Sequence, residues 1–247
     1  MGRSSVEYAT DQITVYKSCP YGCIYCFWKV PLMRSRLQRI EPRPVQEAMM
    51  YARSKRRRVI VISFTTDPYP PCEAYKRLTR RVLEVLSKAP QHRILILTKN
   101  PGLALRDLDL MHIHGDIWLG TTLTCLHDSS FLEPRAPPAQ RRLEALREAH
   151  GEGVKTWVSI EPIIPPFTNV KEIVVTSHGF VDFYVLGAFN YARQLGLPEP
   201  SKREYLKVLA PGLLTLEKLG KRFFIKRELR SLFPYLPAGQ DLKAASR

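Results

Sequence analysis

Residues 59–89, VIVISFTTDPYPPCEAYKRLTRRVLEVLSKA, hold one strand–loop–helix unit of the predicted fold. The run Val59–Phe64 is apolar and rich in β-branched residues, which favours a strand buried on both faces. The polar segment TTDPYPPCE (65–73) follows, and Lys76–Ala89 then repeats its apolar residues at helical spacing. Strand, polar loop and helix in this order are typical of one unit of a parallel α/β sheet.

The same unit recurs along the chain. Other strands are predicted at Ile13–Lys17, Ile94–Thr98, Ile117–Thr122, Thr156–Ile160 and Phe183–Leu186, with Phe223–Ile225 as a possible further strand. Other helices are predicted at Val45–Ser54, Leu103–Leu110, Ala139–His150, Val170–Ser177 and Arg203–Leu219. This alternation predicts parallel strands with right-handed crossovers. An open or partial (β/α)6 barrel fits the 247 residues, although a doubly wound sheet shows the same alternation.

We expect a single domain over residues 1–235 and a short, loosely ordered C-terminal extension over residues 236–247. In both candidate architectures the chemistry gathers at the carboxyl ends of the strands. A polar or cysteine-rich segment follows each predicted strand there: CPYGCIYC (19–26), TTDPYPPCE (65–73), TKNP (98–101), TTLTC (121–125), SIEP (159–162) and GAFN (187–190). These segments predict one functional rim.

The composition indicates a cytoplasmic protein without a membrane partner. Apolar residues make up 45% of the chain, but no apolar run approaches the roughly 20 residues of a membrane helix. The N-terminus has no apolar stretch typical of a signal peptide. The five cysteines are an odd number, and a reducing compartment disfavours a disulfide framework.

The chain carries a formal net charge of +15. Its basic residues come in groups, such as KRRR (55–58), KRLTRR (76–81) and KRFFIKRELR (221–230). Such groups attract phosphate backbones, so an anionic substrate such as DNA or RNA is one interpretation. Solvated helix faces are the other. The oligomeric state is not predicted.

Three cysteines, Cys19, Cys23 and Cys26, lie together in CPYGCIYC. This spacing is compatible with a disulfide, a zinc site, a structural thiol cluster or an iron–sulfur cluster. Structural zinc sites usually have four protein ligands, whereas the other cysteines, Cys72 and Cys125, stand alone. Three thiolates can instead hold a [4Fe–4S] cluster, with one iron left open to a small chelating ligand.

CPYGCIYC resembles the cluster motif of the radical S-adenosylmethionine (SAM) enzymes, whose usual fold is a partial (β/α)6 barrel. The segments SFTTDPYPPCE (63–73) and ILTKNP (96–101) are similar to the spore photoproduct lyase-like branch of that superfamily. The resemblance covers residues 12–190 and extends more weakly to FFIKREL (223–229). It implies a [4Fe–4S] cluster and SAM as cofactors, and an external electron donor as a partner.

The resemblance also implies site residues. Cys19, Cys23 and Cys26 would ligate the cluster, and Lys99 would pair with the SAM carboxylate. The remaining SAM contacts would come from the strand exits: Thr65, Thr66 and Asp67 near the amine or ribose, Thr122 or Thr124 as hydroxyl contacts, Ser159 and Glu161 near the ribose or amine, and the stretch from Tyr184 through Leu186 to Gly187 beside the adenine.

One position departs from the lyase. The cysteine that returns a hydrogen atom in the lyase corresponds to Thr65 here, and the O–H bond of threonine is too strong for that role. Photoproduct lyase activity is therefore disfavoured, and the exact lyase- or transferase-type reaction stays open. Cys72 and Cys125 are the candidate hydrogen donors, although each could simply fill apolar space.

Three function hypotheses follow. The first is a radical SAM enzyme acting on a nucleic acid or nucleotide, with rim aromatics stacking on a base: Tyr69, Phe167, Phe189 and Tyr191. The second is the same chemistry on a peptide or small metabolite. The third is a non-enzymatic nucleic-acid-binding module with a structural metal.

Overall fold

The structure is a computed structural model that describes residues 2–3, 6–38, 41–127, 129–237 and 239–240. Its strands form one sheet in the order β1 to β8. Their bounds are Gly2–Arg3 (β1), Asp11–Ile13 (β2), Val59–Ile62 (β3), Arg93–Thr98 (β4), Ile117–Thr122 (β5), Thr156–Ile163 (β6), Phe183–Ala188 (β7) and Arg222–Ile225 (β8). β1 is antiparallel to β2, and β2 to β8 are all parallel.

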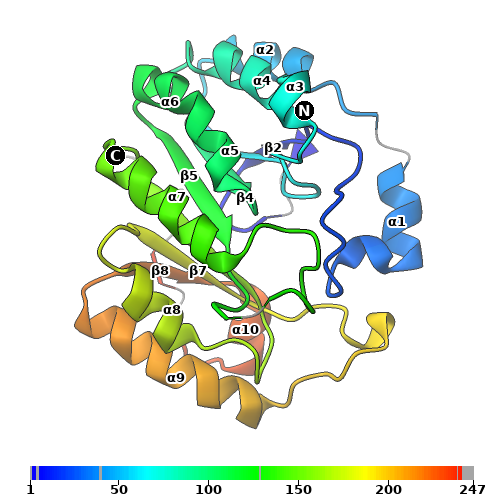
Figure 1. Cartoon of the computed structure of the whole chain (residues 1–247), viewed down its shortest axis with the longest axis vertical. Helices are drawn as coiled ribbons and strands as arrows, with labels where there is room; N and C mark the ends of the chain where they lie inside the picture. The colour runs from blue at the N-terminus through cyan, green and yellow to red at the C-terminus, as the bar shows by residue number, and fades with distance from the viewer. Residues whose placement is uncertain (1, 4–5, 39–40, 128, 238, 241–247) are drawn as a thin grey trace.

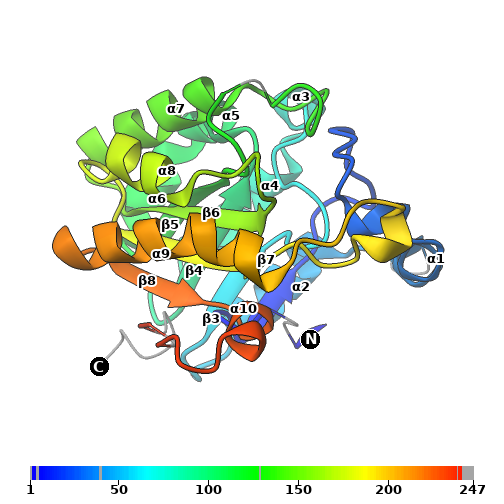
Figure 2. The ribbon, with the colours of Figure 1, turned by 90° about the horizontal axis from the view of Figure 1, so that it is seen from below.

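Helices connect the strands and cover one face of the sheet (Figure 1). The α-helices are Pro31–Gln38 (α1), Pro44–Ala52 (α2), Glu73–Lys76 (α3), Leu78–Leu86 (α4), Pro101–Ala104 (α5), Leu108–His114 (α6), Ala139–Gly151 (α7), Val170–Ser177 (α8), Lys202–Lys218 (α9) and Arg227–Leu232 (α10). Short 3-10 helices span Phe27–Lys29, Leu105–Asp107 and Arg193–Leu195. Figure 2 shows α1 and the 3-10 helix Arg193–Leu195 projecting from the same side of the molecule.

The fold class is confirmed. The parallel strands form an open sheet, since among the described residues β8 pairs only with β7 and no strand pair closes the ring. The seventh parallel strand is β8, which the sequence marked only as possible. The chain is therefore a single α/β domain of the partial-barrel kind rather than a closed barrel.

Alternate residues of the strands feed two apolar cores. Ile60 and Ile62 of β3 pack in the larger core with residues of the covering helices, such as Leu83. Val59 and Val61 of the same strand belong to a smaller core on the other face. Both faces are therefore buried, which explains why the strands read as continuous apolar runs.

Close packing fixes β6 against its neighbours. A Cβ atom on Gly120 of β5 would lie 2.3 Å from the Trp157 indole nitrogen, so only glycine fits here. The Trp157 indole donates a hydrogen bond to the Ile96 carbonyl oxygen of β4 at 3.1 Å. Since Ser159 and Glu161 lie further along β6, this contact helps to set their position at the sheet edge.

Some element bounds differ from the sequence prediction. β2 is Asp11–Ile13 rather than Ile13–Lys17, because its partner β3 ends at Ile62. Beyond that point the Val15 amide donates to the Ser63 hydroxyl at 2.8 Å instead of to a strand. The predicted helix Lys76–Ala89 is divided by Arg77, whose φ of 51° is left-handed.

None of the helices in the described part of the chain is long and apolar enough to cross a membrane. Within the predicted extension 236–247, Gly239 forms an isolated bridge with Phe224 of β8. Residues 238 and 241–247 lie outside the described part, so the predicted looseness of the extension stays a prediction.

Candidate active site

A pocket of about 590 Å³ lies at the carboxyl ends of the parallel strands. Its walls come from the cysteine-rich loop and α1 and from the exits of every strand from β3 to β8. Three carboxylates and two ammonium groups line it, which leaves a formal charge of −1 with neutral thiols: Asp67, Glu161, Glu228, Lys99 and Lys226. A mildly acidic pocket thus sits within a protein of net charge +15.

Cys19, Cys23 and Cys26 all line this pocket. All five cysteines of the chain are free thiols, so the structure contains none of the disulfides considered from the sequence. Among the described residues, no three His, Cys, Asp or Glu side chains converge closely enough to bind a single metal ion. In a four-iron cluster each thiolate binds a different iron atom, so its ligands are spaced more widely than those of one ion.

Neighbouring elements hold the cysteine-rich loop in place. Gly22 has a φ of +69°, and a Cβ atom there would lie 2.6 Å from the guanidinium of Arg135. The Tyr21 hydroxyl donates to the Tyr69 carbonyl oxygen at 2.8 Å, and the Ile24 amide donates to a carbonyl of the β5 exit loop at 2.9 Å. The loop conformation that brings the three thiols to the pocket is therefore specified by its surroundings.

Burial disfavours the thiolate form of these cysteines. It raises the pKa of Cys19 to about 12 and also raises the pKa values of Cys23 and Cys26. A cationic metal reverses this preference, because thiols that coordinate a metal lose their protons. Three thiols that line one pocket match the number of protein ligands of a [4Fe–4S] cluster with one open iron.

Hydrogen bonds to neighbouring segments hold the β3 exit residues in place. Asp67 accepts hydrogen bonds from the Tyr69 amide at 2.8 Å, the Thr98 hydroxyl at 2.6 Å and the Lys99 amide at 2.7 Å. Burial raises the pKa of Asp67, and these hydrogen bonds oppose the rise. Asp67 lines the pocket, but its carboxylate primarily joins the β3 and β4 exits.

The two threonines before Asp67 also line the pocket. The Thr66 hydroxyl donates to the Tyr16 carbonyl oxygen at 2.8 Å. The Thr65 hydroxyl lies 3.2 Å from that of Thr14, and the Thr65 carbonyl oxygen accepts from the Trp28 indole at 2.7 Å. Trp28 thus ties the end of the cysteine-rich loop to the β3 exit.

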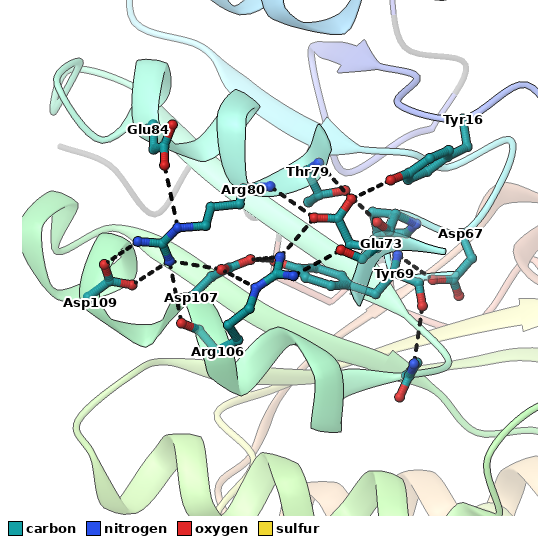
Figure 3. A network of polar contacts seen from close by, with 12 residues as sticks. Tyr16, Asp67, Tyr69, Glu73, Thr79, Arg80, Glu84, Arg106, Asp107 and Asp109 are labelled. Atoms are coloured by element: carbon teal, nitrogen blue, oxygen red, sulfur yellow. Dashed lines mark hydrogen bonds and ion pairs between the residues drawn. The ribbon is translucent and has the colours of Figure 1, made fainter. Parts of the chain in front are cut away.

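A buried polar network lies behind this exit (Figure 3). The Glu73 carboxylate accepts from the Tyr16 hydroxyl, from the Thr79 amide at 3.0 Å and from Arg106 at 2.8 Å. Asp107 accepts from the Tyr69 hydroxyl at 3.0 Å. The Tyr69 carbonyl oxygen accepts the hydrogen bond from Tyr21, so Tyr69 connects this network to the cysteine-rich loop.

Lys99, the predicted partner of the SAM carboxylate, lines the pocket and is already paired. Its ammonium donates to the Tyr25 hydroxyl at 2.7 Å and to Glu133 at 2.8 Å. Glu133 also bonds Arg142, and both carboxylate and guanidinium are 1% exposed. Burial opposes ionisation of Glu133, but Lys99 and Arg142 outweigh it and lower its pKa to about 2.

Ser159 and Glu161, two residues apart on β6, line the pocket on the opposite side. The Ser159 hydroxyl and one Glu161 oxygen, Oε2, are buried without a hydrogen-bond partner. The other Glu161 oxygen accepts from Lys226, which also donates to Glu228 at 2.9 Å. Unpartnered polar atoms on a pocket wall fit a polar ligand such as SAM.

The remaining predicted residues are placed unevenly. Thr122 lines the pocket, and Thr124 is buried with its hydroxyl 3.4 Å from that of Tyr25. The side chains of Tyr184 and Leu186 lie in the larger core, and the Tyr184 hydroxyl contacts Ser177 at 2.9 Å. The β7 exit reaches the pocket through the residues that follow: Ala188, Phe189, Asn190 and Tyr191.

Neither candidate hydrogen donor is among the residues that line the pocket. Cys72 is half-buried and packs against the larger core. Cys125 is half-buried beside a small apolar cluster that includes Leu132 and Phe189.

Sequence reasoning missed several polar residues of this site: Tyr25, Glu133, Asn190, Lys226 and Glu228. Two of them lie in FFIKREL, which carried only a weak signal of resemblance. Tyr25 lies inside the cysteine motif, but nothing in the spacing indicates that it contacts Lys99. Glu133 belongs to no motif.

Comparison with known proteins identifies the family. A family profile described as the Radical SAM superfamily matches residues 13–178. This match covers more than half of the chain, which therefore belongs to the radical SAM superfamily. Members of this superfamily use a [4Fe–4S] cluster and SAM, so the predicted cofactors are confirmed at the level of the family.

Two sequence relatives are themselves uncharacterised. The chain is 28% identical over 183 residues to the uncharacterized protein MJ0683 of Methanocaldococcus jannaschii. The aligned region covers 72% of this chain and 70% of that protein. The chain is 36% identical over 140 residues to the uncharacterized protein ORF301 of Acidianus two-tailed virus. Here the aligned region covers 55% of this chain and 45% of that protein.

Solved structures share the fold. A spore photoproduct lyase mutant superimposes with a TM-score of 0.68 at 14% identity, over 91% of this chain and 78% of the lyase. Streptococcus suis SuiB bound to S-adenosylmethionine gives a TM-score of 0.62 at 13% identity, over 92% of this chain. This chain spans 53% of SuiB, about half of its length.

Proposed function

We propose that this protein is a radical SAM enzyme that holds a [4Fe–4S] cluster through Cys19, Cys23 and Cys26 and acts on a nucleic acid or nucleotide. When bound, the cluster and SAM together supply a 5'-deoxyadenosyl radical that abstracts hydrogen from the substrate, with an external donor providing the electron. One observation carries the proposal: the three free thiols line the same pocket as the unpartnered polar atoms of Ser159 and Glu161.

The chain's own residues bind the cluster and SAM in different ways. The cysteine-rich loop, fixed by Gly22 and Tyr21, presents the thiols. The acidic pocket suits SAM, because the sulfonium group of SAM carries a permanent positive charge. The ammonium of Lys99 has three donors and uses two on Tyr25 and Glu133, so one N–H is left for the carboxylate of SAM.

Replacing Lys99 with alanine should weaken SAM binding by about 1.5–3 kcal/mol, the usual cost of losing a hydrogen bond to a charged group. Iron content should stay unchanged, since Glu133 keeps Arg142 as a partner. Calorimetric titration of SAM into reconstituted protein measures the first effect, and metal analysis the second. Lys88→Ala, at an exposed lysine beyond α4, is the matched control. Loss of the cluster in Lys99→Ala would assign Lys99 to folding instead.

A nucleic acid substrate is favoured by the contrast between the acidic pocket and the basic chain. Basic surface groups suit a phosphate backbone, whereas the pocket suits an uncharged base taken out of its stack. The solved neighbours do not decide between substrate types, because they include spore photoproduct lyase with a dinucleoside and SuiB with a precursor peptide.

Exposed aromatic rings beside the pocket support base stacking. Phe167 is 49% exposed and Phe131 is 68% exposed, and their ring centroids lie 6.5 Å apart. Their neighbours Leu132 and Ile164 pack with the pocket residue Phe189. Tyr69, by contrast, is fully buried and unavailable to a base.

Replacing Phe167 with alanine should weaken binding of a labelled single-stranded oligonucleotide by about 1–3 kcal/mol, the value of one stacked base. The slope of affinity against salt should not change, because no charge is removed. Fluorescence anisotropy at several salt concentrations measures both quantities. Ile113→Ala, which removes an exposed apolar side chain from α6, should have no effect. Salt-independent binding of the oligonucleotide by the wild-type protein would favour the peptide or metabolite alternative.

A further inference from the structure

Lys226 and Glu228 belong to an ion-pair cluster on the pocket wall and have no individual role in the function described so far. Lys226, at the end of β8, bonds Glu161 of β6 and lies 2.9 Å from the Glu228 carboxylate of α10. Glu228 is held in turn by the Asn190 side-chain amide at 3.0 Å. Lys226, Glu228 and Asn190 all lie beyond residue 178, where the match to the superfamily profile ends.

Only one of the two carboxylate oxygens of Glu161 has a hydrogen-bond partner in the pocket wall. Lys226 bonds Oε1, whereas Oε2 is buried and has no hydrogen-bond partner. A Cβ atom on Gly187 of β7 would lie 2.9 Å from two Glu161 side-chain atoms, so the absence of a side chain there makes room for this carboxylate. An unpartnered buried carboxylate oxygen costs free energy unless a donor meets it.

Burial and the charged groups beside Glu161 act on its carboxylate in opposite directions. Burial raises the pKa of Glu161 and Glu228 adds to the rise, whereas Lys226 opposes it. Tyr8, below the pocket, is buried, and its pKa is raised by burial and by both carboxylates. Burial would lower the pKa of Lys226, but Glu161 and Glu228 raise it above its ordinary value.

We propose that Lys226 is a positioning residue that holds Glu161 in the pocket as a carboxylate, so that the free Glu161 oxygen accepts a hydrogen bond from an N–H or O–H of SAM. The inference rests on the proposed function, because SAM is the ligand. Glu228 and Asn190 fix the Lys226 ammonium from the other side. Without Lys226, the buried Glu161 would take up a proton. Its carboxyl group would then present an O–H hydrogen-bond donor to the N–H or O–H donor of SAM, and the two donors cannot pair.

The test is the pH dependence of SAM binding, measured by calorimetry on reconstituted protein between about pH 6 and 9. The quantity compared is the ratio of variant to wild-type affinity at each pH, in which the titration of SAM itself cancels. Lys226→Met should bind SAM about 10- to 100-fold more weakly at the acid end, and its affinity should recover as the pH rises and Glu161 ionises.

Three further variants separate this role from a structural one. Lys226→Arg keeps the charge and should restore a flat profile. Glu161→Gln should be weak at every pH, and it keeps the proposal falsifiable if Lys226→Met does not fold. The double variant Lys226→Met with Glu161→Gln should lose the pH dependence, because the titrating group is gone.

A flat profile in Lys226→Met, or wild-type affinity in Glu161→Gln, would overturn the inference while leaving the proposed function intact. If the wild-type protein binds no SAM at all, the proposed function itself fails, and this inference fails with it.

Discussion

Replacing Cys23 with alanine should abolish the brown colour, the iron and sulfide content, and the formation of 5'-deoxyadenosine. Cys23 is 5% exposed and lines the pocket between Cys19 and Cys26. Two remaining thiolates leave two of the four iron atoms of a cluster without a protein ligand, which is too few to retain it. The measurements are metal analysis of anaerobically reconstituted protein and its absorbance at about 400 nm, where thiolate-bound clusters absorb.

The chain supplies a matched control for this substitution. Cys72 is half-buried and packs against the larger core outside the pocket. Cys72→Ala should therefore keep its full iron content, whatever its effect on substrate turnover. Equal iron loss in both variants, or normal SAM cleavage in Cys23→Ala, would contradict the ligand assignment.

Replacing Glu133 with glutamine should destabilise the fold by about 3–5 kcal/mol, the usual cost of removing one partner from a buried ion pair. The carboxylate is 1% exposed and faces Lys99 and Arg142, so its loss leaves two positive groups uncompensated in the interior. A loss of this size is a large share of a typical folding free energy of about 5–15 kcal/mol. Urea unfolding of the metal-free protein gives the value directly.

Acid titration tests the same carboxylate in the unmodified protein. The pKa of Glu133 is lowered to about 2 in the fold from an ordinary value of 4.5. Its contribution to stability is therefore complete above 4.5 and is lost as the pH falls towards 2. Glu133→Gln should lack this part of the acid sensitivity. Glu144→Gln, which removes an exposed partner of Arg141 on α7, should change neither stability nor its pH dependence appreciably. Equal behaviour of the two variants would show that the buried pair adds nothing.

The sequence predicts most of this fold because its strands and helices carry strong local patterns. The bounds of β5 and α8 agree with the sequence prediction to the residue, since each is an apolar segment whose limits are clear in the sequence. Helix α10 escaped prediction because its six residues, RELRSL, bury only Leu229 and therefore show no period. The bounds of β2 depended on where β3 ends, which no local pattern records.

The site divides along similar lines. The spacing of the three cysteines is a local signal, and their lining of one pocket agrees with it. The ion pairs are not local: Lys226 meets Glu161 across 65 positions of the chain, and Lys99 meets Glu133 across 34. Asp67 shows the opposite case. The resemblance implies a SAM contact for Asp67, whereas its carboxylate accepts three hydrogen bonds within the protein.

The central claim is that the three thiols of the pocket hold a cluster that cleaves SAM. The most direct test is to reconstitute the wild-type protein anaerobically with iron and sulfide, add SAM and a strong reductant, and quantify 5'-deoxyadenosine. We expect a brown protein with about four iron atoms per chain that forms 5'-deoxyadenosine only when the reductant is present. Protein that contains zinc without iron or sulfide, or iron-loaded protein that forms no 5'-deoxyadenosine, would contradict the account.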